Sequence, residues 1–310
     1  EILDLCLECK GCKTQCPSQV DIAKLKSEFL YQYQEKHGYS LRSRLFAHLP
    51  LWNSLLSIFP KLANLLLRSS FNRFVLKKLG VAPQRSLPSL APYRFSSWVE
   101  KQRPMNAQAE PVYLFTDTYT EYHCPEVGQA AYLILKQLGF QVLTTKPQCC
   151  RRPMISKGLL KPAKKGLSKL SDSLTCFAEQ KIPIIVLEPS CLSVLRDDLV
   201  SFFPDKDISS IQLQCKSFEE FLLEQIESLP PIIESSTVHF HVHCHEKALM
   251  SSSVMSQFFK KLGQKAQEIP TGCCGMAGSF GYESEHYDVS QKVAALALLP
   301  YLKRVSSAEQ

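Results

Sequence analysis

The chain has 310 residues, of which 45% are hydrophobic and 21% charged, and its formal net charge is +7 at neutral pH. This composition excludes a wholly disordered protein, because it matches that of folded soluble domains. Thirteen cysteines are many for this length, but the N-terminus does not resemble a signal peptide and no run of about 18 apolar residues occurs. We therefore expect a cytoplasmic protein whose cysteines are reduced or bound to metal.

The first segment, residues 1–38, begins with four closely spaced cysteines and ends with a helix that Gly38 terminates. The cysteines are Cys6, Cys9, Cys12 and Cys16. With the proline that follows, they form C-x2-C-x2-C-x3-C-P, the spacing of bacterial ferredoxins. A tight loop would direct the first three thiolates at one [4Fe–4S] cluster, and Cys16 would point toward a second cluster. Structural zinc is the alternative, although zinc sites rarely hold four cysteines so close together.

The start of the chain adds one expectation about its origin. The sequence has one ferredoxin-type run and begins at Glu1 without an initiator methionine. Two-cluster ferredoxins use two such runs. We expect the chain to be cut from a longer protein, or to work with a separate subunit that carries the other run.

The second segment, residues 39–110, carries the positive charge of the chain. Residues 36–103 hold twelve Lys and Arg against Glu100 alone. Short apolar and basic helices broken by Pro50 and Pro60 are expected up to residue 80, followed by a Pro-rich linker. The interpretation that we favour is an arm that packs on another part of the enzyme. Peripheral contact with an anionic membrane, at its inner face, is the alternative, and the aromatic residues among leucines argue against nucleic-acid binding.

From residue 111 onward the pattern predicts strands alternating with helices, and hence parallel α/β layers. Strands are expected at 111–117, 141–145, 182–191 and 238–246, and helices at 125–140, up to Lys181, at 217–228, up to residue 261 and from 287 onward. The strand at 182–191 is expected to run into a loop. We expect one module at 111–235 and another at 236–310. The predicted fold is thus multi-domain: a helical ferredoxin-like segment, a helical linker, and α/β with two cysteine-rich modules.

The two modules share one order of features. Each has a strand, a single cysteine, a helix ending in Leu-Gly, a second strand and a pair of adjacent cysteines. The cysteines are Cys124, Cys149 and Cys150 in the first module, and Cys244, Cys273 and Cys274 in the second. Two similar modules that face each other could combine their cysteines in one site.

These motifs together resemble the C-terminal iron–sulfur part of FAD-linked 2-hydroxyacid dehydrogenases. The motifs are CLECKGCKTQCP, LFTDTYTEYHCPEVGQAAYLILKQLGF, CCRRPMISKGLL, EPSC, HCHEKAL and GCCGMAGSFGYE. The resemblance extends to the iron–sulfur subunits of glycolate oxidase and anaerobic glycerol-3-phosphate dehydrogenase, and to the cysteine-rich CCG module of the heterodisulfide reductase B subunit. It implies a flavin domain upstream or on a partner, and electron transfer from FAD through 4Fe-4S clusters to a quinone or another carrier.

The resemblance also assigns candidate site residues. The metal ligands that it implies are Cys6, Cys9, Cys12, Cys16, Cys149, Cys150, Cys191, Cys244, Cys273 and Cys274. One departure is that the first pair continues as CCR instead of CCG, which puts heterodisulfide-type chemistry in doubt. Another is that no closing C-x2-C follows either pair.

Histidines and the remaining cysteines are weaker candidates. Four histidines alternate at 239, 241, 243 and 245, so on one strand all would face the same side. We expect His243 and His245, which flank Cys244, to be candidates for contact with a cofactor. Cys176 and Cys215 are expected to be buried and inert.

The function that these patterns favour is the iron–sulfur electron-transfer part of an FAD-linked D-2-hydroxyacid dehydrogenase, acting on lactate, glycolate or 2-hydroxyglutarate. This part would be inactive without the flavin domain. A stand-alone thiol–disulfide oxidoreductase that uses the CCG cysteines is the alternative from another class, and a structural zinc protein is the third.

Overall fold

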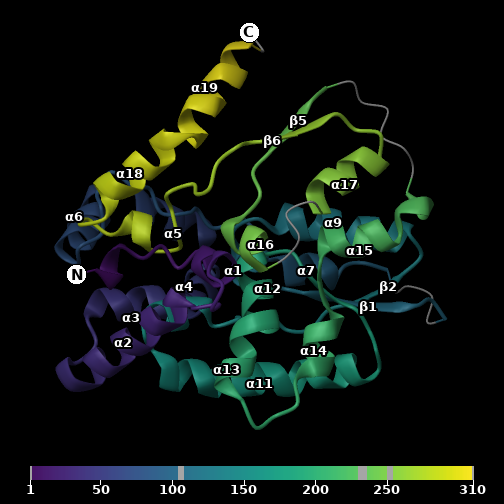
Figure 1. Cartoon of the computed structure of the whole chain (residues 1–310), viewed down its shortest axis with the longest axis horizontal. Helices are drawn as coiled ribbons and strands as arrows, with labels where there is room; N and C mark the ends of the chain where they lie inside the picture. The colour runs from purple at the N-terminus through teal and green to yellow at the C-terminus, as the bar shows by residue number, and fades with distance from the viewer. Residues whose placement is uncertain (1, 104–107, 230–235, 250–253, 309–310) are drawn as a thin grey trace.

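The computed structural model describes residues 2–103, 108–229, 236–249 and 254–308, and it is mostly helical around two small parallel sheets (Figure 1). The larger sheet has the strand order β2-β1-β3-β4, and all its strand pairs are parallel. Its strands are β1 (Pro111–Phe115), β2 (Gln141–Leu143), β3 (Ile184–Val186) and β4 (Cys215–Ser217). The expected parallel α/β layer is confirmed. The ferredoxin-type and CCG modules, and the domain boundaries, stay predictions.

Alternate residues of β1 and β3 build two hydrophobic cores, one on each face of this sheet. Tyr113, Phe115 and Ile184 belong to one core, and Val112 and Leu114 belong to the other. The first core is covered by α10 (Arg152–Ser156), α11 (Leu160–Glu179), α12 (Pro189–Ser193), α13 (Leu199–Phe202) and α14 (Ser209–Gln214). The second is covered by α7 (Phe95–Val99), α9 (Pro125–Gln137) and α15 (Phe218–Glu224). Figure 1 shows α11 and α14 on one side of the strands and α9 and α15 on the other.

The N-terminal third is helical. Its helices are α1 (Gly11–Gln15), α2 (Ile22–His37), α3 (Leu41–Ala47), α4 (Leu49–Leu56), α5 (Pro60–Arg68) and α6 (Ser70–Lys78). Gly38 ends α2 with a φ of +84°, as predicted for a helix stop. Pro50 and Pro60 occupy the first turns of α4 and α5, where a missing N–H costs nothing. The Pro-rich segment after α6 includes α7 and buries Phe95 completely.

The second sheet pairs β5 (Val238–Phe240) with β6 (Ala266–Glu268) in parallel. The helices of this part of the chain are α16 (Cys244–Leu249), α17 (Val254–Lys261), which packs on β6, α18 (Tyr287–Leu296) and α19 (Leu298–Ala308). The expectation of one strand at 238–246 is wrong, because β5 ends at Phe240 and α16 begins at Cys244. The four histidines therefore do not share one strand face. Part of the helix expected to reach residue 261, residues 250–253, and the module boundary at 235 lie outside the described residues.

The segment after β3 also differs from the prediction. The loop expected after β3 is α12, which continues into a π-helix over Val194–Asp198. Glu188 caps α12, and Pro189 occupies its first turn.

Among the described helices, none combines the length and apolar character needed to cross a bilayer.

Candidate metal centre

The ferredoxin-type loop takes its shape from two residues with left-handed backbone. Glu8 has a φ of +54° and Lys10 a φ of +60°, a conformation that non-glycine residues adopt at a cost. These reversals let the chain curl so that backbone N–H groups face sulfur. The Glu8 N–H donates to Cys6 Sγ at 3.4 Å and the Ile22 N–H donates to Cys12 Sγ at 3.3 Å. Such N–H to sulfur hydrogen bonds stabilise thiolates and tune iron–sulfur potentials.

Cys16, the fourth cysteine of the run, differs from the others. It lies just after α1, and the backbone N–H groups of Val20, Ser18 and Gln19 lower its pKa. A lowered pKa favours the thiolate, which is the form that binds metal. This environment suits Cys16 as a ligand.

A buried ion-pair network holds the loop to the rest of the protein. Lys10 lies between Cys9 and Cys12 and is 1% exposed. Its ammonium contacts Asp197 at 2.5 Å and Asp198 at 2.6 Å, both at the end of the π-helix. Burial lowers the pKa of Lys10, but the Asp198 charge and the hydrogen bonds with Asp197 and Asp198 together outweigh burial, and the net pKa is raised. The protonated lysine thus stays charged and paired inside the protein.

The same two aspartates also bind other cations. Arg152, two residues after Cys150, contacts Asp198 at 2.5 Å. Lys13 and Lys24 contact Asp197, the latter at 3.2 Å. The network therefore connects the ferredoxin-type loop directly to the first cysteine pair. Sequence reasoning missed it, since nothing in the order of residues relates Lys10 to acids almost 190 positions later.

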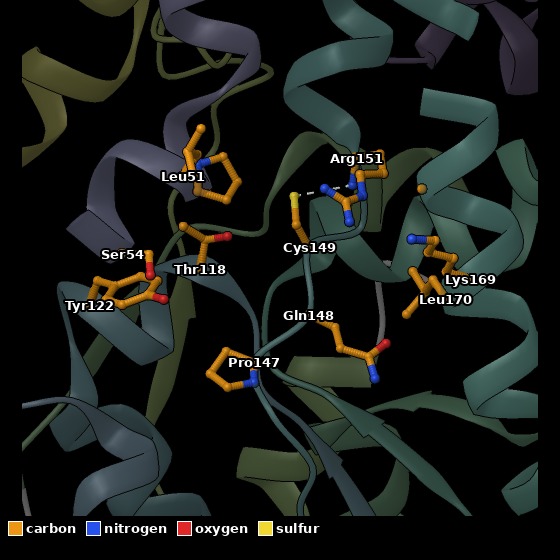
Figure 2. Close-up of a pocket in the computed structure, with 12 residues that line it drawn as sticks. Leu51, Ser54, Thr118, Tyr122, Pro147, Gln148, Cys149, Arg151, Lys169 and Leu170 are labelled. Atoms are coloured by element: carbon orange, nitrogen blue, oxygen red, sulfur yellow. Dashed lines mark hydrogen bonds between the residues drawn. The ribbon is translucent and has the colours of Figure 1, made fainter. Parts of the chain in front are cut away.

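The first cysteine pair lies beyond the carboxyl end of β2 and meets a cysteine from α12. Cys191 Sγ donates to Cys150 Sγ at 2.8 Å, and both residues are buried. The hydrogen bond with Cys150 lowers the pKa of Cys191, but burial together with the nearby charges of Asp117 and Glu188 outweighs it and raises the pKa to about 12. Cys149 lines a cavity of about 460 Å³ between α4, α8 (Thr118–Tyr122) and α11. Figure 2 shows Cys149 among the residues around this cavity, joined to Arg151 by a hydrogen bond.

The second pair repeats the backbone arrangement of the first. The Gly275 N–H donates to Cys273 Sγ at 3.3 Å, and the Arg151 N–H donates to Cys149 Sγ at 3.3 Å. Gly275 has a φ of +83° and Arg151 a φ of +63°. The change from CCG to CCR therefore keeps the left-handed turn and its hydrogen bond. Gly166 on α11 makes room for the extra side chain, because a Cβ there would lie 2.3 Å from Arg151 Nε.

This turn predicts a large effect for a small substitution. A Cβ at Gly275 would lie 2.2 Å from the Ser290 carbonyl oxygen, in addition to the cost of the left-handed backbone. We expect Gly275→Ala to lower the free energy of unfolding by about 3 kcal/mol, measured by urea denaturation. Gly272→Ala is the matched control, since nothing lies within 4 Å of its Cβ, and equal losses in both variants would contradict the argument.

Cys244 connects the two sets of cysteines. It begins α16, which packs against α1 and α12 (Figure 1). Burial, and then the negative charges of Cys9 and Cys274, raise the pKa of Cys244 to about 11. Cys9 belongs to the ferredoxin-type loop and Cys274 to the second pair, so Cys244 lies within electrostatic range of both.

The two candidate histidines hold elements together. His245 Nε2 lies 2.9 Å from the Glu8 carbonyl oxygen, and its Nδ1 lies 3.4 Å from the Ser193 hydroxyl. Burial, and then the Arg152 charge, lower the pKa of His245 to about 3, so the ring is neutral. The His243 ring lies 5.2 Å from the His245 ring, and its Nδ1 accepts from the His245 N–H. His245 thus positions the ferredoxin-type loop against α12, and a cofactor contact stays a prediction for both.

The three remaining cysteines, which are not among the candidate metal ligands, lie at other helices and strands. Cys124 precedes α9 and is exposed. Cys215 on β4 is fully buried, as predicted. Cys176 on α11 is exposed, so the expectation that it is buried is wrong.

The donor set, which is made mostly of cysteines, fits iron–sulfur binding. In the described parts of the chain, one group of three His, Cys, Asp or Glu side chains has ligand atoms within 4.8 Å of one another, and it is Glu283, Glu285 and His286. Cysteine sulfurs around one zinc ion lie close together, because Zn–S bonds are about 2.3 Å long. No three cysteine sulfurs of the described residues form such a close group, and the N–H groups directed at several of them are compatible with iron–sulfur ligation.

Comparisons with known proteins relate the chain to dehydrogenases. The chain is similar to a D-2-hydroxyglutarate dehydrogenase. That protein, from Escherichia coli (strain K12), is 26% identical over 98% of this chain, which spans 31% of its length. One subunit of the anaerobic glycerol-3-phosphate dehydrogenase of the same strain is 25% identical over 90% of this chain and 72% of its own. Lactate utilization protein A 1 of Bacillus mycoides (strain KBAB4) is 27% identical over 54% of this chain. No family model matches the chain.

The coverage limits what carries over from these relatives. This chain spans about a third of the D-2-hydroxyglutarate dehydrogenases that it matches. It spans most of the glycerol-3-phosphate dehydrogenase subunit. The similarity thus relates the chain to one part of dehydrogenases, and the whole enzyme's activity enters only as a proposal.

Proposed function

We propose that the chain is the iron–sulfur electron-transfer part of an FAD-linked D-2-hydroxyacid dehydrogenase. The observation that carries this proposal is the packing of α16, which begins at Cys244, against α1, which lies within the ferredoxin-type loop. Electron transfer requires neighbouring redox centres, and this packing supports such a role. The similarity to dehydrogenases along nearly the whole chain supports the same role.

In this proposal each set of cysteines would hold an iron–sulfur cluster. Cys6, Cys9 and Cys12 would hold a [4Fe–4S] cluster, and Cys16 would point to a second one. The paired cysteines, with Cys191 and Cys244, would hold another centre. When bound, such clusters accept and release electrons one at a time. The chain's own residues shape the loops, supply N–H groups to sulfur, and fix the distance between the sets through Lys10 and His245.

The partners follow from the same proposal. FAD, on an upstream segment or a partner subunit, would take electrons from lactate, glycolate or 2-hydroxyglutarate. This chain would pass them on to a quinone or another carrier. The test is anaerobic reconstitution with iron and sulfide, followed by iron counting and EPR spectroscopy. The absence of an iron–sulfur signal, even with the flavin-bearing part supplied, would overturn the proposal, and zinc without iron would favour a structural zinc protein.

The outer face of the helical arm, α3 to α6, is a candidate interface. Apolar side chains are exposed there beside Lys and Arg; they include Leu55, Phe59, Leu65, Phe71 and Phe74. Exposed apolar patches mark interaction surfaces. We propose that this face packs on the flavin-bearing part, and an anionic membrane surface is the alternative.

A vesicle-binding assay distinguishes the two candidate partners of this face, the flavin-bearing part and an anionic membrane. If the arm binds membranes, reversing Lys77 and Lys78 to Glu should lower co-sedimentation with phosphatidylglycerol vesicles by at least about tenfold, since each basic residue contributes about 1 kcal/mol. Reversing Lys164 and Lys165 on α11 is the matched control. Equal binding by both variants, or no binding by the unmodified chain, would leave the flavin-bearing part as the partner of the arm.

A further inference from the structure

A second cavity, of 390 Å³, lies between the helical arm and the first cysteine pair. Its volume is in the range of small-molecule sites. One wall is apolar and comes from α3 to α6 and the segment after them, with Phe46, Leu49, Trp52, Leu67 and Leu76. The opposite wall carries Cys149, Cys150, Cys191, Asp117, Glu188 and Arg152. An apolar chamber thus ends at three of the candidate cluster ligands.

The position of the cavity in the sheet points to a ligand. Asp117 follows β1 and Glu188 follows β3, so both lie beyond the carboxyl ends of adjacent parallel strands. The strand order β2-β1-β3-β4 reverses the direction of the connections between β1 and β3. In open α/β sheets, ligands bind beyond the carboxyl ends of the strands at this switch point.

Polar groups of the cavity suit a carbonyl-bearing ring. Arg152 lines the cavity, and its Nε is buried with no hydrogen-bond partner among the described residues. A buried N–H without a partner is costly unless a ligand accepts from it. His123 also lines the cavity, oriented by Asn53 at 2.7 Å and by the Ser89 carbonyl at 2.9 Å. A flat ring with oxygen atoms at its edge would meet apolar side chains on its faces and a donor at its rim.

We propose that this cavity binds a quinone-class electron acceptor, a ring with two carbonyl oxygens and an apolar tail. The inference rests on the proposed function, because the reductant is the iron–sulfur centre at the cysteines, itself reduced through the flavin. A centre held by these cysteines would supply two electrons, one at a time, and water would supply two protons, so that the quinone would become the hydroquinone without a covalent bond to the protein. The arm's apolar side chains would receive the tail.

The test is direct binding of decylubiquinone to the full 310-residue chain. Every ring position of this quinone is substituted, so it cannot add to a cysteine thiol. Quinones quench nearby tryptophan fluorescence, and the chain has two tryptophans. Trp52 lines the cavity, whereas Trp98 stacks with Phe95 in the core on the far face of the sheet. We expect saturable quenching that Trp52→Phe abolishes, and equal quenching in that variant would overturn the proposal.

A matched pair of variants on α5 tests the wall. Leu67 lines the cavity, whereas Leu65, two residues earlier, is 69% exposed and is not part of its lining. Leu67→Gln should weaken decylubiquinone binding by roughly tenfold, because it places an unpaired amide on the apolar wall, and Leu65→Gln should leave it unchanged. Equal effects in both variants, or displacement of the quinone by decanol at equal concentration, would contradict a site that recognises the ring.

The binding assay is independent of cluster assembly. Quenching through Trp52 in a chain that never takes up iron would support the cavity and contradict the proposed electron transfer. An iron–sulfur signal without saturable quenching would contradict the cavity and leave the electron-transfer role standing.

Discussion

Replacing Cys9 with serine should remove most of the iron that the chain binds in anaerobic reconstitution. Cys9 belongs to the ferredoxin-type loop, whose helix α1 packs against α16, the helix that begins at Cys244. Because a serine hydroxyl is a poor ligand for iron in a sulfur-rich site, we expect iron retention to weaken by at least about tenfold. The measurements are iron and acid-labile sulfide per chain, with EPR spectra after reduction.

Cys176→Ser is the matched control for this experiment. Cys176 is exposed on α11, and its thiol donates to the Ser173 carbonyl within the same helix. Its loss should leave iron, sulfide and the EPR signal unchanged. The ligand assignment fails if the Cys9 variant keeps the full iron content, or if both variants lose iron equally.

The second large effect is expected at Asp198. Asp198→Asn removes the charge that faces Lys10 and Arg152, both of which are largely buried. Removing one partner of a buried pair leaves the other charge uncompensated, which costs about 3 kcal/mol in the free energy of unfolding. The measurement is urea denaturation of variants prepared in the same way as the unmodified chain. Asp172→Asn is the control, because its pair with Lys206 is exposed and should contribute less than about 1 kcal/mol.

The same ion pairs predict how stability depends on pH. Burial raises the pKa of Asp198, but the Arg152 and Lys10 charges outweigh it and the net pKa is lowered. The pKa of an aspartate in the unfolded chain is about 3.9. The stability that the ionised Asp198 contributes is therefore complete above that pH, and it is lost as the pH falls through the lower pKa of Asp198 in the folded protein. The stability difference between the unmodified chain and Asp198→Asn should therefore shrink below about pH 4. A difference that grows on acidification would contradict the pairing.

Much of the α/β layer could be predicted from the sequence, since its strands are continuous apolar runs between helix-period segments. The prediction of a strand over residues 238–246 was wrong for a physical reason. Its partner β6 spans only Ala266–Glu268, so β5 pairs over three residues. Alternating histidines look like a strand even where no partner extends the ladder. The helix α12 was also missed, although Glu188 before Pro189 is a recognisable helix start.

The cysteine sets could be proposed from spacing, but their connections could not. Lys10 is one of many lysines in the sequence, and only the fold shows that it is buried against Asp197 and Asp198. The π-helix that presents these adjacent aspartates has no signal in the sequence. The turn at Arg151 is another example, because a left-handed arginine contradicts residue preferences, and only the fold shows that its side chain packs where Gly166 has no Cβ.

The ion pairs around Asp197 and Asp198 have a consequence for how a metal centre on the cysteine loop could be rebuilt after its metal is lost. Many small metal sites unfold when they lose their metal, because the metal supplies the folding free energy. Here the cysteine loop is tied down by Lys10, Lys13 and His245 through contacts that involve no metal. If the loop holds the proposed cluster, oxidative damage that removes the iron should therefore leave an ordered, empty loop. Such a protein could take up iron and sulfide again without first unfolding and without new synthesis of the chain.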